Sequence, residues 1–131
     1  MGRTKLKKPS HQPFEGKNRT GLFFKITNEM VSSPAWRDLS LEARGLYVEF
    51  KAKYRQRVDD GKVVSCNVDD ISMPVSEYSA FCGQRKFERT RDELISHGFI
   101  QLLKRQKYMG QPNIFGLSDE WQNWRAPPRK H

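Results

Sequence analysis

One stretch of the sequence decides the fold: residues 83–103, which read GQRKFERTRDELISHGFIQLL. A helix is predicted from residue 84 to about residue 97, because apolar side chains recur there at helical spacing. The side chains that cluster on one side of this helix are Phe87, Thr90, Leu94 and Ile95. Gly98 then supplies the residue type that most often ends a helix. Residues 99–103 follow as an apolar strand, so the stretch predicts a helix, a tight turn and a strand.

A second strong helix lies upstream. It is predicted from Leu41 to about Arg55, and Ser40 is a good N-cap for it. Its apolar stripe at helical spacing consists of Ala43, Leu46, Tyr47, Phe50 and Tyr54. Such a stripe predicts a helix with one face in the core.

Shorter elements fill the rest of the chain. The expected helices lie at residues 28–33, ended by Pro34, at about residues 74–81, and as a last turn through Trp121 and Trp124 that packs back on the domain. The expected strands lie at residues 62–66, after a turn at residues 59–61, and at residues 113–117, which form a hairpin with residues 99–103. The order is therefore helix, strand, helix, tight turn, helix and hairpin.

This order is that of a winged helix-turn-helix domain, and particular residues carry the resemblance. Residues 87–100 resemble the recognition helix and first wing strand of bacterial winged-helix regulators and of plasmid or phage replication proteins. The acidic-Leu pair and the Gly-apolar-Ile step of that family are matched by Asp92-Glu93-Leu94 and Gly98-Phe99-Ile100. Two further segments are similar to the first helix of the family and to the end of its wing, Ser40-Leu41-Glu42-Ala43-Arg44-Gly45-Leu46-Tyr47 and Ile114-Phe115-Gly116-Leu117-Ser118-Asp119-Glu120-Trp121.

The resemblance covers roughly residues 22–121 and implies the fold class. We expect an α+β fold, mainly α, with about three helices, a short strand and a β-hairpin wing. Two positions depart from the family. Gly83 stands where Ser or Thr usually caps the recognition helix, and Arg91 occupies a position that is often apolar, so its stem is expected to cover the core with its head in water.

The net charge of +9 is concentrated at the two ends of the 131-residue chain. Residues 1–20 contain six basic residues and one acidic residue, and residues 125–131 contain three basic residues and no acidic one. Residues 21–124 have 15 bases and 14 acids. We therefore expect a disordered basic arm at residues 1–20, a winged helix-turn-helix domain at residues 21–124 and a disordered basic tail at residues 125–131. Basic arms commonly lie along nucleic-acid phosphates, although a merely solubilising terminus is the alternative.

The resemblance implies which residues contact DNA. In this family the N-terminal part of the recognition helix, about residues 84–97 here, reaches base edges in the major groove, and the wing, about residues 101–117, meets the backbone or minor groove. Residues 83–107 contain seven basic and three acidic residues, which fits this role. The expected contacts are Gln84, Arg85, Lys86 and Arg89 on the helix, Lys104, Arg105, Lys107 and Tyr108 on the wing, and Lys5, Lys7 and Lys8 on the arm. An ordinary solvated face is the competing interpretation, and Glu88 and Asp92 are expected to pair with Lys86, Arg89 or Arg91.

The expected function is sequence-specific binding of double-stranded DNA, by a transcriptional regulator or a replication-initiator-type protein of a mobile element. Half-site recognition usually needs a homodimer, but neither a heptad nor an obvious dimer helix is evident, and residues 22–26 or the Trp-bearing C-terminus are the segments that could serve. One alternative is a protein-interaction module of a replication or transcription complex, with Met109, Trp121 and Trp124 as its apolar contacts. Another is RNA or single-strand binding, with Tyr108 and Phe115 as stacking surfaces.

The sequence favours no catalytic, metal or cofactor site. A Gly-rich phosphate loop, a nucleophile elbow and an HExxH motif are all absent, so no enzyme and no small-molecule ligand are expected. Cys66 and Cys82 have no paired ligand spacing and are expected as buried structural thiols. No hydrophobic leader or membrane-spanning stretch is present, which predicts a bacterial cytoplasmic or nucleoid location without a membrane partner.

Overall fold

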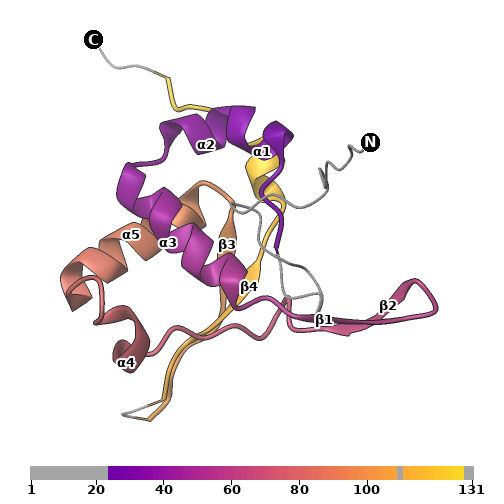
Figure 1. Ribbon diagram of the computed structural model, residues 1–131. Coiled ribbons are helices and arrows are strands. Elements are labelled where there is room, and N and C mark those ends of the chain that lie inside the picture. The colour runs from indigo at the N-terminus through magenta and orange to yellow at the C-terminus, as the bar shows by residue number, and fades with distance from the viewer. Residues whose placement is uncertain (1–23, 109–110, 129–131) are drawn as a thin grey trace, which may run out of the picture.

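The computed structural model describes residues 24–108 and 111–128, which adopt an α+β fold (Figure 1). Within these residues the helices are α1 Asn28–Ser32, α2 Pro34–Asp38, α3 Leu41–Ala52, α4 Val75–Tyr78, α5 Gln84–Ser96 and the 3-10 helix η2 Glu120–Asn123. The strands are β1 Gln56–Asp59, β2 Lys62–Cys66, β3 Ile100–Lys104 and β4 Ile114–Leu117. They form two antiparallel hairpins, β1–β2 and β3–β4. None of the described helices has the length and apolar character that a membrane crossing requires.

The core lies between α3, α5 and the hairpin β3–β4. The inner face of α3 buries the first four residues of the predicted stripe, and α5 buries Phe87, Thr90 and Leu94. Aromatic rings join the layers edge to face: Phe50 of α3 meets Phe115 of β4 with ring centroids 5.3 Å apart, and Tyr47 meets Phe99 at 5.2 Å. Burying such side chains supplies most of the free energy that stabilises a small domain.

Ile71 adds a third backbone segment to the hairpin β3–β4, because it pairs with Phe115 on the free side of β4. The N–H of Ile71 donates to the carbonyl of Phe115 at 2.9 Å, and the N–H of Phe115 donates back to Ile71 at 2.7 Å. Ile71 is also 1% exposed. The segment before α4 is therefore fixed to the sheet on the β4 side.

The C-terminal end of α5 requires Gly98. Its φ is 85°, and a Cβ there would lie 2.5 Å from the backbone nitrogen of Trp121. The N–H of Phe99 donates to the carbonyl of Leu94 at 3.0 Å, and the N–H of Gly98 donates to Ile95 at 3.1 Å. These two bonds form a Schellman motif, which confirms the predicted helix end.

The prediction of about three helices and a single short strand before the hairpin is wrong in two places. The helix predicted at residues 28–33 does end before Pro34, as α1, but the prediction lacks the second helix that Pro34 begins. This helix, α2, is capped by Ser33, whose hydroxyl accepts from the N–H of Trp36 at 3.2 Å. The predicted strand at residues 62–66 exists, but it is paired with β1 across a turn in which Asp60 and Gly61 have φ of 54° and 75°. Two adjacent residues with positive φ are typical of the type I′ turn that matches the twist of a hairpin.

The first long helix also ends earlier than predicted, at Ala52 rather than near Arg55. Asn67 causes the change in direction. Its side-chain oxygen accepts from the N–H of Arg55 at 2.6 Å, and its side-chain amide donates to the carbonyl of Lys53 at 2.9 Å. The chain therefore leaves the helix to enter β1, and the hairpin β1–β2 extends away from the helices in Figure 1.

Candidate nucleic-acid interface

The outer face of α5 has the predicted exposure. Phe87 and Thr90 point inward and are each 5% exposed, whereas Arg85 and Arg89 lie on the opposite face and are exposed. The helix is therefore anchored along one side and presents cations along the other.

The cations of α5 differ in what they touch. Arg91 pairs with Asp92 at 2.9 Å, as expected, and Lys86 lies 3.9 Å from a carboxylate oxygen of Glu42 on α3. Within the part of the chain that the structure describes, Arg85 and Arg89 have neither an ion pair nor a side-chain hydrogen bond. Their guanidinium groups are therefore available to an external anion or base edge.

Gln84 and Glu88 behave differently from the prediction. The amide of Gln84 donates to the carboxylate of Glu88 at 3.1 Å, so Glu88 bonds to an amide and not to one of the basic side chains expected as its partner. This bond spans one helical turn on an exposed surface, and such bonds are weak. Gln84 must release this hydrogen bond before the oxygen and the NH₂ group of its amide can both contact a DNA base.

The N-terminal end of α5 is open. Gly83 is its N-cap and makes no side-chain cap hydrogen bond, and the first turn contains no acidic residue. The first N–H groups of a helix have no partner inside the helix and form the positive end of its dipole. Gly83 has φ of −80°, an ordinary extended value, and a Cβ there would meet nothing within 4 Å.

The wing prediction places its residues on the hairpin β3–β4 and beyond it. Lys104, Arg105, Lys107 and Tyr108 are all exposed, and Tyr108 is 69% exposed. The side chain of Asn113 accepts from the N–H of Gln106 at 2.7 Å, which joins the two arms of the hairpin past its last ladder pair.

A groove of about 710 Å³ lies between α4, α5 and this hairpin. Phe87, Tyr78 and Phe115 lie among its apolar lining, and the Tyr78 and Phe87 rings stack 4.0 Å apart. Arg91 of α5 and Arg105 beyond β3 line it together with polar side chains. The groove therefore has Gln84 and Glu88 of α5 on one side and Arg105 on the other. No motif in the sequence predicts this groove.

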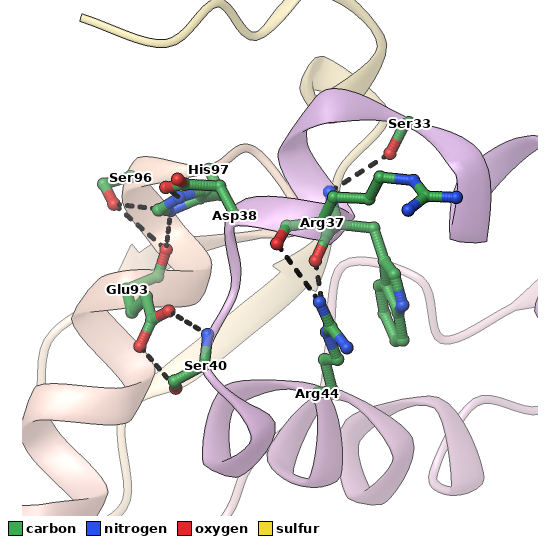
Figure 2. A network of polar contacts seen from close by, with 9 residues as sticks. Ser33, Arg37, Asp38, Ser40, Arg44, Glu93, Ser96 and His97 are labelled. Carbon is green, nitrogen blue, oxygen red and sulfur yellow. Dashed lines mark hydrogen bonds and ion pairs between the residues drawn. The ribbon is translucent and has the colours of Figure 1, made fainter.

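The opposite half of α5 is held by Glu93. Its two carboxylate oxygens accept from the N–H of Ser40 at 2.6 Å and from the hydroxyl of Ser40 at 2.8 Å (Figure 2). The same hydroxyl accepts from the N–H of Ala43 at 3.1 Å. This is the bonding of a capping box, but the carboxylate comes from α5, because the third residue of α3 is Ala43 and has no carboxylate. In the sequence Glu93 stands out only as part of the acidic-Leu pair of the family pattern, and this contact was not predicted.

His97 makes a second connection at the same end. Its Nε2 lies 2.7 Å from a carboxylate oxygen of Asp38, and its Nδ1 lies 2.8 Å from the carbonyl oxygen of Glu93 (Figure 2). Its ring also stacks on Trp124 at 4.7 Å. Both ring nitrogens therefore lie within hydrogen-bond distance of an oxygen of another residue. α2, the end of α5 and the C-terminal segment are thus joined through one side chain.

Several predicted residues are placed otherwise than expected. Neither cysteine is buried as predicted, since Cys66 is exposed and Cys82 is half-buried. Cys66 is exposed because every residue of β2 is exposed. Phe115 is 2% exposed and Trp121 5%, which removes the first as a stacking surface and the second as a protein contact. In the described residues no three or more His, Cys, Asp and Glu side chains are grouped so that they could hold a metal ion.

Other predictions lie outside the described residues. They concern the arm residues Lys5, Lys7 and Lys8, the whole proposed arm at residues 1–20, Met109 near the hairpin tip, and Arg129 and Lys130 in the proposed tail. The domain bounds and the contacts of these residues remain predictions.

Comparisons with protein-family models, with curated proteins and with solved structures found no match to this chain.

Proposed function

We propose that this chain is a winged helix-turn-helix protein that binds double-stranded DNA with sequence preference. α3, the Ile71 segment, α4, α5 and the hairpin β3–β4 follow one another in the order of such a domain. In this interpretation α5 is the recognition helix, β3–β4 is the wing and β1–β2 is an insertion after the first helix. The proposed role is that of a transcriptional regulator or replication-initiator-type protein of a mobile element, in the bacterial cytoplasm or nucleoid.

The outer face of α5 supports this proposal most. Arg85 and Arg89 are one turn apart, exposed and without a protein partner in the described chain. Arginine can donate two parallel hydrogen bonds to the O6 and N7 atoms of guanine. In the proposal, the open N-terminal end of α5 and the exposed wing cations Lys104, Arg105 and Lys107 add phosphate contacts that position the helix without reading sequence.

Binding to duplex DNA is favoured over binding to single strands. A single-strand site usually stacks successive bases on exposed aromatic rings. Of the two rings considered for this role, Tyr108 is exposed but Phe115 is buried in the core. One exposed ring is a weak stacking platform, whereas an anchored helix with outward arginines suits a major groove.

The test begins with selection of bound duplexes from a random DNA pool. Titration of the selected site should then show that Arg85→Ala with Arg89→Ala weakens binding by about 2–5 kcal/mol and relaxes the sequence preference. The matched control is Arg37→Ala with Arg57→Ala, which removes the same charge from two exposed arginines on α2 and β1. Equal losses in both double variants, or an unchanged preference in the first, would show that α5 does not read the site.

A further inference from the structure

The outer face of α3 is apolar, although no part of the described chain covers it. Leu41 is 77% exposed and Val48 is 36% exposed. Gly45 and Ala52 are exposed between and after them. Leu41 is more exposed than any other large apolar side chain of the described residues. We call these four residues the α3 stripe.

The α3 stripe has the spacing of a helix–helix seam. Its members follow one another at intervals of four, three and four residues, which is the apolar pattern of a coiled coil. The stripe lies opposite the buried face of α3, since the core residues Ala43, Leu46, Tyr47 and Phe50 fall on the other side of the helix. The helix therefore has two apolar faces, and only one is used within the chain.

The two flanks of the α3 stripe carry opposite charges. Glu42 and Glu49 lie along one flank, and both are exposed. Lys86 of α5 lies 3.9 Å from Glu42, so Glu49 is the acid of this flank that has no ion pair within the described chain. Arg44 and Lys51 lie along the other flank, and both are half-buried. The guanidinium of Arg44 is fixed beside the stripe, because it donates to the carbonyl oxygens of Trp36 and Arg37 at 3.2 Å each (Figure 2). A guanidinium has five N–H groups, so donors remain for a further acceptor.

We propose that a second copy of this chain packs on the α3 stripe, with the two α3 helices parallel and related by a two-fold axis along them. This rotation places the acidic flank of each helix against the basic flank of the other. In the seam register, Arg44 of one copy faces Glu49 of the second copy, and the reverse pair forms by symmetry. An antiparallel arrangement would instead bring acid against acid and base against base. Charge complementarity therefore selects both the occupant and its direction.

Space beside the stripe suits close approach. A Cβ built on Gly45 would meet nothing within 4 Å, and a cavity of about 270 Å³ lies next to it, between α3 and α5. The exposed ring of Phe81 lines this cavity and extends the apolar surface. The helix is only about 18 Å long, so the contact is smaller than a standard interface of about 1,600 Å². We therefore expect a reversible dimer with a dissociation constant of about 10⁻⁵ to 10⁻³ M.

This inference does not rest on DNA binding, so its test uses the full chain without nucleic acid. Sedimentation equilibrium from micromolar to millimolar concentration should show a reversible monomer–dimer equilibrium. Val48→Lys should leave a monomer at every concentration, because it places a charge in the seam. The matched control is Val31→Lys, which changes an exposed valine of α1 outside the stripe and should dimerise as the parent does. Thermal unfolding shows whether both variants are folded.

The charged flanks are tested separately. Glu49→Lys should weaken dimerisation about tenfold or more, because it sets like charges opposite Arg44 in two symmetric places. Glu29→Lys makes the same charge change on α1 and should have no effect. If the parent stays monomeric at millimolar concentration, or if the stripe and control variants behave alike, the proposal is wrong. A parent that stays monomeric because another segment of its own chain covers the stripe would overturn it equally.

A disulfide tests the direction of the helices. Gly45→Cys, in a background of Cys66→Ser and Cys82→Ser, should form a covalent dimer with oxidised glutathione, because equivalent positions of the seam face each other in a parallel pair. Antiparallel helices would instead cross-link a Leu41→Cys chain to an Ala52→Cys chain in a mixture. Cross-linking of that mixture without cross-linking of Gly45→Cys would refute the parallel arrangement.

Discussion

The two ends of α5 differ in how they are held. At the C-terminal end, Glu93 bonds to α3, His97 lies between Asp38 and Trp124, and Gly98 closes a Schellman motif. At the N-terminal end, Gly83 makes no side-chain cap, and Arg85 has no partner in the described chain. One end is built into the domain, whereas the other presents unpaired donors to solvent.

This difference separates stability from binding along one helix. A helix can offer its N-terminal N–H groups and side chains to a ligand only if something else fixes its direction. Here the fixing contacts lie at the opposite end, about three turns away. Substitutions at the fixed end should therefore lower the free energy of unfolding, and substitutions at the open end should change affinity with little loss of stability.

The largest expected effect is at the fixed end, from Glu93→Gln. The substitution removes the negative charge and replaces one carboxylate oxygen by an NH₂ group. The bond from the Ser40 N–H then has a neutral acceptor, and the Ser40 hydroxyl loses the acceptor of the bond that it donates. Charge-assisted bonds of this kind contribute about 1.5–3 kcal/mol each, roughly twice as much as neutral bonds, and here two of them are weakened together. We expect the free energy of unfolding to fall by about 2–3 kcal/mol in urea titrations.

Asp92→Asn is the control for this variant, because it changes the neighbouring carboxylate in the same way. Asp92 is exposed and pairs only with Arg91, so the expected loss is below about 0.5 kcal/mol. Equal losses from the two variants would show that the contact between α5 and Ser40 does not anchor the helix.

Sequence pattern predicted the parts of the fold that depend on local spacing. The apolar stripes of α3 and α5 and the glycine after His97 are periodic or short-range signals, and they gave the helices, the turn and the strand β3. Two elements were missed. α2 begins at Pro34, which predicts the end of α1 correctly but is also common at a first helical position, so the sequence did not reveal that a second helix starts there. β1 contains one apolar residue in four, and its pairing with β2 depends on backbone hydrogen bonds that side-chain pattern does not encode.

The sequence predicted which side chains of α5 and the wing face outward, but not the contacts that hold α5 in place. The residues expected on α5 and the wing are exposed as predicted, because cations rarely enter a core unpaired. The bond from Glu93 to Ser40 joins residues 53 positions apart, and no periodicity reports on such a contact. A usable signal did exist: Ser40 caps a helix whose third residue, Ala43, cannot supply the usual carboxylate, so a distant acid is needed.

A smaller effect is expected at the open end, from Gly83→Asp. The new side chain can accept from the first N–H groups of α5, and Gly83 already has a compatible backbone with open space for a Cβ. The free energy of unfolding should therefore rise by about 0.5–1 kcal/mol. Affinity for the selected duplex should fall about tenfold, because the carboxylate occupies the N–H groups and repels phosphate. Anisotropy titration and urea unfolding measure the two changes.

Gly83→Ser separates capping from charge. Serine supplies the same cap without a negative charge, so it should stabilise the fold while affinity stays within about threefold of the parent, a change of less than 1 kcal/mol. If Gly83→Asp bound as tightly as the parent, the N-terminal end of α5 would not face phosphate.

At neutral pH the smallest effect is that of the Tyr47 phenol, whose ring packs on Phe99 at the fixed end. This effect develops only in alkaline solution. Burial, with a smaller contribution from the Asp119 carboxylate, raises the pKa of the Tyr47 phenol above its ordinary value. Above about pH 10 the unfolded chain releases a phenol proton that the folded chain keeps, so the free energy of unfolding falls by up to about 1.4 kcal/mol per pH unit. Below that pH the phenol is protonated in both states and has no effect on the free energy of unfolding.

Tyr47→Phe should make this fall shallower in urea titrations between pH 9 and 11. The control is Tyr108→Phe, which changes an exposed side chain and should leave the slope unchanged. An unchanged slope in Tyr47→Phe would mean that the packing at the fixed end opens before the phenol ionises, and that this end is held less firmly than its contacts indicate.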